Sequence, residues 1–131
     1  AIQGKRDALT IFGTDYDTPD GTCIRDYVHV MDLVDAHVLG LNWLEQGKGS
    51  RVFNLGTGTG FSVREVIENA ESITGKEVPR IEGPRRPGDC TKLVSGSSRA
   101  EAELGWTPAR STLDQMIGDA WRWHQTGHYD K

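Results

Sequence analysis

The chain has 131 residues, of which 36% are hydrophobic and 26% charged, a composition typical of one soluble globular domain. Its net charge of -4 excludes a general nucleic-acid binder, which carries a basic stripe and a high pI. No apolar run reaches the roughly 18 residues of a membrane span, and the start lacks a signal-peptide core, so we expect a cytoplasmic protein without membrane or nucleic-acid partners.

The first predicted elements are a strand, a loop, and a strand that leads into a helix. Residues 9–12 form a short β-type run that ends at Gly13, and the polar residues 14–22 contain turn-forming Pro and Gly. Residues 26–30 alternate aromatic and β-branched side chains as a strand does. Apolar residues then recur at helical spacing over 33–44.

The middle of the chain repeats the strand-then-helix order. Residues 51–55 predict a second strand, which the glycine-rich residues 56–60 join to a helix opened by the capping box of residues 62–65. That helix closes at Thr74-Gly75-Lys76. Residues 78–81 then predict a short edge strand, because a proline within it cannot donate to a ladder.

Two further helices are predicted near the end. Ser98 caps a short helix that ends at Leu104-Gly105, and Thr112 caps a last helix that runs through Trp123. Alternating strands and helices predict an α/β fold, and nothing divides residues 1–131 into two domains. Two or three strands make only a thin, incomplete sheet, since a parallel sheet needs helices over both faces.

The glycine-rich residues 56–60 are a tempting dinucleotide-binding loop, but we interpret them as a tight strand-to-helix turn. The fingerprint needs glycine at its sixth position, where this chain has Phe61, and no acidic residue clearly ends a following strand. A Tyr-x-x-x-Lys pair is also missing, because Tyr16, Tyr27 and Tyr129 have no lysine four residues later. We therefore predict no cofactor-binding and no catalytic residues in this chain.

Metal binding and disulfide formation are also disfavoured. His124 and His128 could share a helix face, but Gly127 is expected to end the helix between them, so no metal site is predicted. Cys23 and Cys90 lack C-x-x-C spacing, which favours two free thiols. A disulfide between the two loops that carry them is the alternative.

Two arginine-bearing loops are the strongest functional signal. Arg25 follows Gly-Thr-Cys-Ile in the loop over 21–30, and Arg86 stands three residues before Asp89 across a Pro-Gly turn. A guanidinium binds phosphate oxygens in a fixed plane, and a carboxylate suits sugar hydroxyls. The alternative for Arg25 is a solvated surface charge. The neighbouring Arg85 is less suited, because adjacent side chains diverge.

Taken in order, five segments resemble the C-terminal part of the UDP-glucose 4-epimerases, in the extended short-chain dehydrogenase/reductase family. They are residues 9–13, 21–33, 53–56, 84–89 and 104–106, and the resemblance covers nearly the whole chain. It implies the C-terminal part of a Rossmann-type parallel-sheet enzyme with a small substrate-binding lobe. It also implies a bound NAD that takes hydride from C4 of UDP-glucose or UDP-galactose and returns it to the other face.

The resemblance implies a role for several residues of this chain. Thr10, Ile11 and Phe12 match the segment that contacts uracil, largely through its backbone. Arg25 and Arg86 match the arginines that bind the diphosphate. The same segments are shared with sibling nucleotide-sugar dehydratases and decarboxylases.

Three further residues complete the implied site. Asp89 matches the carboxylate that binds ribose, and Tyr27 supports the same region. Leu93 falls where the family has a residue that lines the sugar pocket and influences whether N-acetylated sugars fit.

The NAD-binding loop and the catalytic residues of the family are expected upstream, in an N-terminal portion absent from this chain. We therefore expect a fragment that does not catalyse alone and that exposes apolar surface, which favours self-association or a homodimer. The alternatives are a stand-alone UDP-sugar-binding module and the same portion of a sibling dehydratase or decarboxylase.

Overall fold

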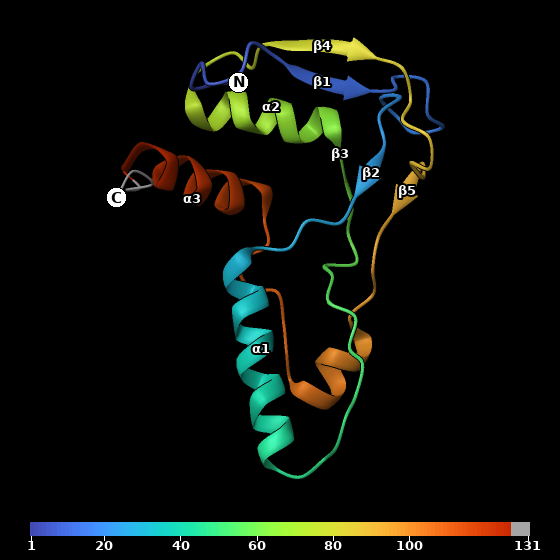
Figure 1. Ribbon diagram of the computed structural model, residues 1–131, viewed down its shortest axis with the longest axis vertical. Helices are drawn as coiled ribbons and strands as arrows, with labels where there is room; N and C mark the ends of the chain where they lie inside the picture. Colours follow the sequence, from blue (N-terminus) through green and yellow to red (C-terminus); the bar gives the residue numbers. More distant parts are fainter. Residues whose placement is uncertain (127–131) are drawn as a thin grey trace.

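The computed structural model describes residues 1–126, which form two groups of packed elements joined by extended segments (Figure 1). In the first group, β1 (Leu9–Phe12) and β4 (Arg80–Gly83) make a parallel two-stranded sheet. This sheet lies over α2 (Val63–Thr74), which in turn packs against α3 (Leu113–Thr126). The apolar core between them contains Ile11, Ile67 and Val78.

In the second group, α1 (Val30–Glu45) lies beside the short π-helical turn η1 (Ala100–Leu104). Its core contains Ala36, Ala100 and Trp106. Trp106 is only 1% exposed, and its Nε1 donates to the backbone carbonyl of Asp32 at 2.7 Å. The indole thereby fills the space between α1 and η1 while its polar atom is satisfied.

A small mixed sheet connects the two groups. Its order is β3 (Phe61–Ser62), β2 (Ile24–Arg25) and β5 (Lys92–Leu93), with β2 antiparallel to β3 and parallel to β5. The α/β prediction with an incomplete sheet is confirmed. None of the helices in residues 1–126 combines the length and apolarity that crossing a bilayer requires.

Two of the three predicted helix caps are confirmed. Ser62 and Glu65 form the capping box of α2 through bonds of 2.6 and 3.0 Å, and Thr112 Oγ1 accepts from the Gln115 amide at 3.3 Å. The cap predicted at Ser98 is wrong by one residue. Ser97 starts that helical stretch, because its carbonyl accepts from the Glu101 amide and its hydroxyl donates to the Glu101 carboxylate.

Three predicted strands differ from the structure. Residues 26–30 do not form a strand, since β2 ends at Arg25 and His29 caps α1 by accepting from the Met31 amide at 3.0 Å. Residues 51–55 pair with no strand among the described residues. The edge strand predicted over 78–81 begins at Arg80, because Pro79 cannot donate and the Val78 amide donates to Glu71.

Candidate nucleotide-sugar site

Arg25 lies at the end of β2, in the centre of the small mixed sheet. Its register places Phe61 opposite it on β3 and Leu93 opposite it on β5. One guanidinium nitrogen donates to the carbonyls of Ile24 and Cys90, both at 2.8 Å, and the other lies 3.5 Å from Asp89 Oδ1. Arg25 is therefore an ordered, largely covered cation rather than a solvated charge.

Arg86 converges on the same carboxylate from the second loop. Its Nε donates to Asp89 Oδ2 at 2.9 Å, and its guanidinium stacks over the Phe12 ring at 4.7 Å from the centroid. Gly88, with φ of 86°, makes the turn that brings Arg86 and Asp89 together. Two guanidinium groups thus share one carboxylate, which leaves the cluster with net positive charge for an anionic ligand.

Arg85 points away from this cluster. Its Nε donates to Asp15 Oδ1 at 2.7 Å, and its guanidinium lies over the Tyr16 ring at 4.2 Å. The side-chain hydrogen bond to Asp15 raises the pKa of Arg85 and lowers the pKa of Asp15. The expected divergence of Arg85 and Arg86 is what the structure shows.

The three predicted residues of β1 face different ways. Ile11 is 2% exposed and belongs to the core, whereas Phe12 is 39% exposed and its ring lies beside Arg86. Thr10 packs close to Gly83 of β4, where an added Cβ would come within 2.9 Å of its methyl group. The phenyl ring is thus the side chain of β1 that reaches the arginine cluster.

Leu93 and Tyr27 flank Arg25. Leu93 is 62% exposed, and together with Arg25 it lines a pocket of about 400 Å³. The other lining residues are Asp26, Asn54, Leu55, Val94, Ser95 and Gly96. Tyr27 is half-buried, and this burial raises the pKa of its phenol, with a smaller increase from Cys23 that Arg25 opposes.

Sequence reasoning missed Asp26, Asn54 and Ser95 as pocket residues. Asp26 and Asn54 lie in segments that carry the family resemblance but had no role assigned to them, and Ser95 lies in a segment without a recognisable motif. Burial raises the pKa of the Asp26 carboxyl, but hydrogen bonds from Thr57 and further backbone amides outweigh burial and lower it overall. Asp26 therefore remains ionised at neutral pH.

The glycine-rich residues 56–60 are not the predicted strand-to-helix turn, because no strand directly precedes them and β3 separates them from α2. The Thr57 amide donates to both oxygens of the Asp26 carboxylate, at 3.0 and 3.1 Å, and the Gly58 amide donates to one of them at 3.3 Å. These amides are the groups that would otherwise bind a pyrophosphate, so the loop does not fit the diphosphate of NAD.

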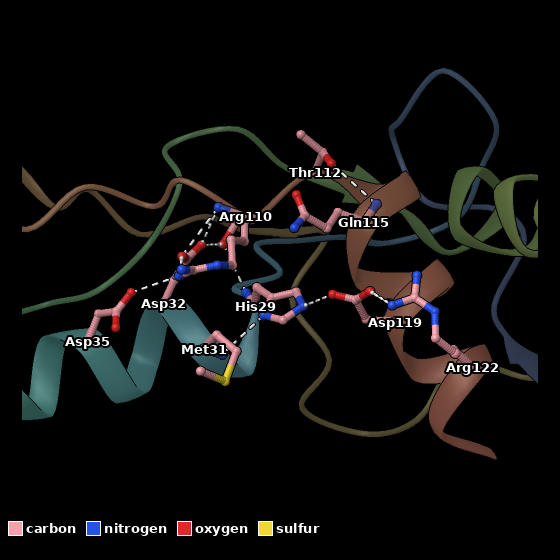
Figure 2. A network of polar contacts seen from close by, with 10 residues as sticks. His29, Met31, Asp32, Asp35, Arg110, Thr112, Gln115, Asp119 and Arg122 are labelled. Carbon is pink, nitrogen blue, oxygen red and sulfur yellow. Dashed lines mark hydrogen bonds and ion pairs between the residues drawn. The ribbon is translucent and has the colours of Figure 1, made fainter. Parts of the chain in front are cut away.

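A second polar cluster lies near the start of α1, away from the arginine loops. Figure 2 shows Asp32 bound to Arg110. It also shows His29, whose Nδ1 accepts from the Met31 amide and whose Nε2 lies 3.1 Å from Asp119 Oδ2. The Met31 contact caps α1, whereas the contacts of Asp32 and His29 join the start of α1 to the segment that leads into α3 and to α3 itself, which gives the cluster a structural role.

No metal site and no disulfide are found in the described part of the chain. No group of three or more metal-ligating side chains gathers there, and His128 of the predicted pair lies outside the described residues. Cys23 is buried and Cys90 is exposed, and both are free thiols, as the sequence predicted.

Comparisons with known proteins agree on one family. Residues 2–120 match the family model described as GDP-mannose 4,6 dehydratase. A UDP-glucose 4-epimerase of Azospirillum brasilense is 52% identical over 96% of this chain, and that of Homo sapiens is 47% identical over 93%. The chain spans only 36% and 35% of these two relatives.

Solved structures give the same result. A crystal structure of a UDP-glucose 4-epimerase superposes with a TM-score of 0.91 and 48% identity, covering 98% of this chain and 40% of the other. The Bifidobacterium longum UDP-glucose 4-epimerase, solved with NAD+ and UDP, has a TM-score of 0.86 and 39% identity over 96% and 37% of the two chains. These matches confirm the resemblance to UDP-glucose 4-epimerases, while the position of the matched part within them stays a prediction.

Proposed function

The chain belongs to the family described as GDP-mannose 4,6 dehydratase, and from this premise we propose that it is the C-terminal, UDP-sugar-binding portion of a UDP-glucose 4-epimerase. The observation that carries the proposal is the convergence of Arg25 and Arg86 on Asp89 from two distant loops. We propose residues 1–131 as one unit with a single ligand site.

Each group of this site has a role that its contacts support. Arg25 and Arg86 bind the diphosphate, because each offers a guanidinium fixed by a carbonyl, a carboxylate or a ring. Asp89 accepts the ribose hydroxyls. The backbone of β1 contacts uracil, and Leu93 lines the sugar pocket beside Tyr27.

The hydride chemistry of the intact enzyme belongs to another portion. NAD, when bound, supplies the hydride acceptor and donor. In this chain the amides of Thr57 and Gly58 donate to the Asp26 carboxylate and not to a cofactor, and the sequence has no Tyr-x-x-x-Lys pair. The task of this chain is to hold the nucleotide and to orient the sugar. We therefore propose that the chain alone is not catalytic.

An apolar face of α1 is the surface on which we propose that an NAD-binding portion of the intact enzyme docks. A stripe of apolar side chains on α1 is 44–66% exposed, comprising Val30, Met31, Val34, Val38, Leu41 and Leu44. Beside it, residues 51–55 are extended but pair with no strand among the described residues, and Val52 is 76% exposed. An apolar helix face next to an unpaired extended segment is what an interrupted α/β sheet exposes.

This docking surface gives a test of its own. The isolated chain is expected to self-associate in light scattering, and Leu41→Asp, which places a charge in the stripe, is expected to reduce that association. A monodisperse monomer of the unsubstituted chain at high concentration would argue against the docking surface.

The main test is nucleotide binding by the intact protein. Arg86→Ala is expected to weaken UDP binding by roughly 10- to 100-fold, because a charge-assisted hydrogen bond contributes about 1.5–3 kcal/mol. Uridine, which has no phosphate, is expected to bind almost equally well. Arg80→Ala is the matched control, since Arg80 is a surface arginine paired with Glu71.

The name of the matching family model favours a second candidate, a sibling nucleotide-sugar dehydratase or decarboxylase with the same UDP-sugar site. Conversion of UDP-galactose to UDP-glucose by the intact protein separates the two. Loss of UDP binding in Arg86→Ala with no such conversion would support the sibling, and unchanged UDP binding would contradict the site itself.

A further inference from the structure

We propose that Asp26 is a positioning residue for Arg25. Its carboxylate accepts hydrogen bonds from residues 56–60, the glycine loop, and thereby fixes the direction of the guanidinium that binds the diphosphate. The inference rests on the proposed role of Arg25. It also gives a function to the glycine loop, which binds a carboxylate of the chain itself.

The Asp26 carboxylate accepts hydrogen bonds from two separate segments. Thr57 donates from its amide at 3.0 Å and from its hydroxyl at 2.6 Å, and the Gly58 amide donates at 3.3 Å. The Ser95 amide, two residues after β5, donates at 3.1 Å. Both oxygens are therefore occupied by donors, which leaves Asp26 to act through its neighbours rather than on a ligand.

Gly56 shows why this loop requires glycine. A Cβ added there would lie 2.3 Å from the Ser95 carbonyl oxygen and 2.7 Å from Asp26 Oδ2. At the other end of the loop, a Cβ on Gly60 would lie 2.4 Å from a methyl carbon of Ile24. The glycines thus let the loop backbone pack directly against β2 and the segment after β5.

This packing determines where Arg25 points. The Asp26 amide donates to the Leu93 carbonyl at 3.1 Å, so the backbone of Asp26 extends the pairing of β2 with β5 while its side chain ties down Ser95. Arg25 itself is held by the Cys90 carbonyl, just before β5. If Asp26 releases Ser95, β5 is held less firmly against β2, and the Cys90 carbonyl before β5 holds the Arg25 guanidinium less firmly.

A double-mutant cycle on the intact protein tests this, with UDP and uridine as ligands in titration calorimetry. Arg25→Ala is expected to raise the Kd for UDP by roughly 10- to 100-fold and Asp26→Asn by about 10-fold, with uridine little changed. Because Asp26 acts through Arg25, the double variant should bind UDP about as weakly as Arg25→Ala alone.

Asp20→Asn is the matched control. Asp20 also accepts from an amide and a hydroxyl, both of Thr22, and from the Ser62 hydroxyl, but it does not line the pocket. It should lower the melting temperature without changing the ratio of UDP to uridine affinity. Thr57→Val, which removes the 2.6 Å hydroxyl bond to Asp26 and the hydroxyl contacts with Thr59 but keeps the Thr57 amide, provides a milder variant if Asp26→Asn does not fold, and it should shift the same ratio by a smaller factor.

The possible outcomes are distinct. If Arg25→Ala weakens UDP binding but Asp26→Asn and Thr57→Val do not, the positioning role is overturned while the proposed function stands. Equal loss of UDP and uridine binding in Asp26→Asn would also overturn it, because that pattern means general disorder of the site. If Arg25→Ala has no effect, the diphosphate role of Arg25 fails, and the inference fails with it.

Discussion

Asp32 and Asp35 both pair with Arg110. Comparing the two carboxylates shows how burial and distance each affect the contribution of such a pair to stability. Arg110 lies 2.8 Å from the Asp35 carboxylate but 3.6 Å from that of Asp32. Yet the Asp32 side chain is 1% exposed and that of Asp35 is 52% exposed. Figure 2 shows both carboxylates reaching toward Arg110 from the start of α1. We predict that the buried Asp32 carboxylate contributes far more to stability than the exposed Asp35 carboxylate, although it lies farther from the Arg110 guanidinium.

The magnitude follows from what each substitution leaves behind. Asp32→Ala removes the acceptor for the Arg110 amide at 2.9 Å and for the Ser111 hydroxyl at 2.6 Å. An unsatisfied buried donor costs about 1–3 kcal/mol, and Asp32→Ala leaves two donors without their acceptor, so we expect a loss of about 2–6 kcal/mol. Asp35→Ala breaks only a solvent-exposed pair, for which about 0–1 kcal/mol is expected.

Urea unfolding followed by tryptophan fluorescence measures both variants. Trp106 reports on this region, because its indole donates to the Asp32 carbonyl. The midpoint should fall strongly for Asp32→Ala and barely for Asp35→Ala, with similar m-values. Equal losses for the two variants would refute the reasoning, since burial would then not decide the energy of the pair.

Three further predictions concern the glycine loop, acid stability and the cap of α1. Gly56→Ala should destabilise by roughly 1–3 kcal/mol more than Gly96→Ala in thermal unfolding, because a Cβ at Gly56 meets a backbone oxygen while Gly96 faces open space and has no positive φ. The lowered pKa of Asp26 stabilises the fold fully above the ordinary Asp value of about 3.9, and this stability is lost as pH falls through the lower folded-state pKa. Asp26→Asn should therefore flatten the dependence of unfolding free energy on pH between about pH 5 and 2. His29→Ala should cost about 1 kcal/mol more than His29→Asn in urea unfolding, because asparagine can still cap the helix.

The sequence predicted well those elements whose signals are local. The capping box at Ser62 and the left-handed Gly75, with φ of 65°, mark both ends of α2 without reference to any other part of the chain. Strands were predicted less well, because pairing depends on a distant partner. β5 gave no recognisable pattern in its two residues, and residues 51–55 have strand composition without a strand partner.

In the candidate site, too, local signals could be predicted from the sequence and contacts between distant segments could not. The residue types of the two arginine loops indicated an anion site, and the resemblance pointed to Arg25, Arg86 and Asp89, which the structure brings together. The role of Asp26 could not be predicted, since its donors come from Thr57 and Ser95, far away in the sequence. Such a contact becomes visible only once β2 and β5 are paired.

The two arginine loops depend on the glycine loop because one small sheet carries them both. β2 leads into Asp26, and β5 follows directly from the loop that holds Arg86 and Asp89. With only two residues in each strand, few backbone hydrogen bonds hold this sheet, so side-chain bonds at its edge contribute a large share of its order. The Asp26 carboxylate accepts from four donor groups, on Thr57, Gly58 and Ser95, which gives the segment with three glycines a structural reason to lie next to the pocket that Arg25 lines.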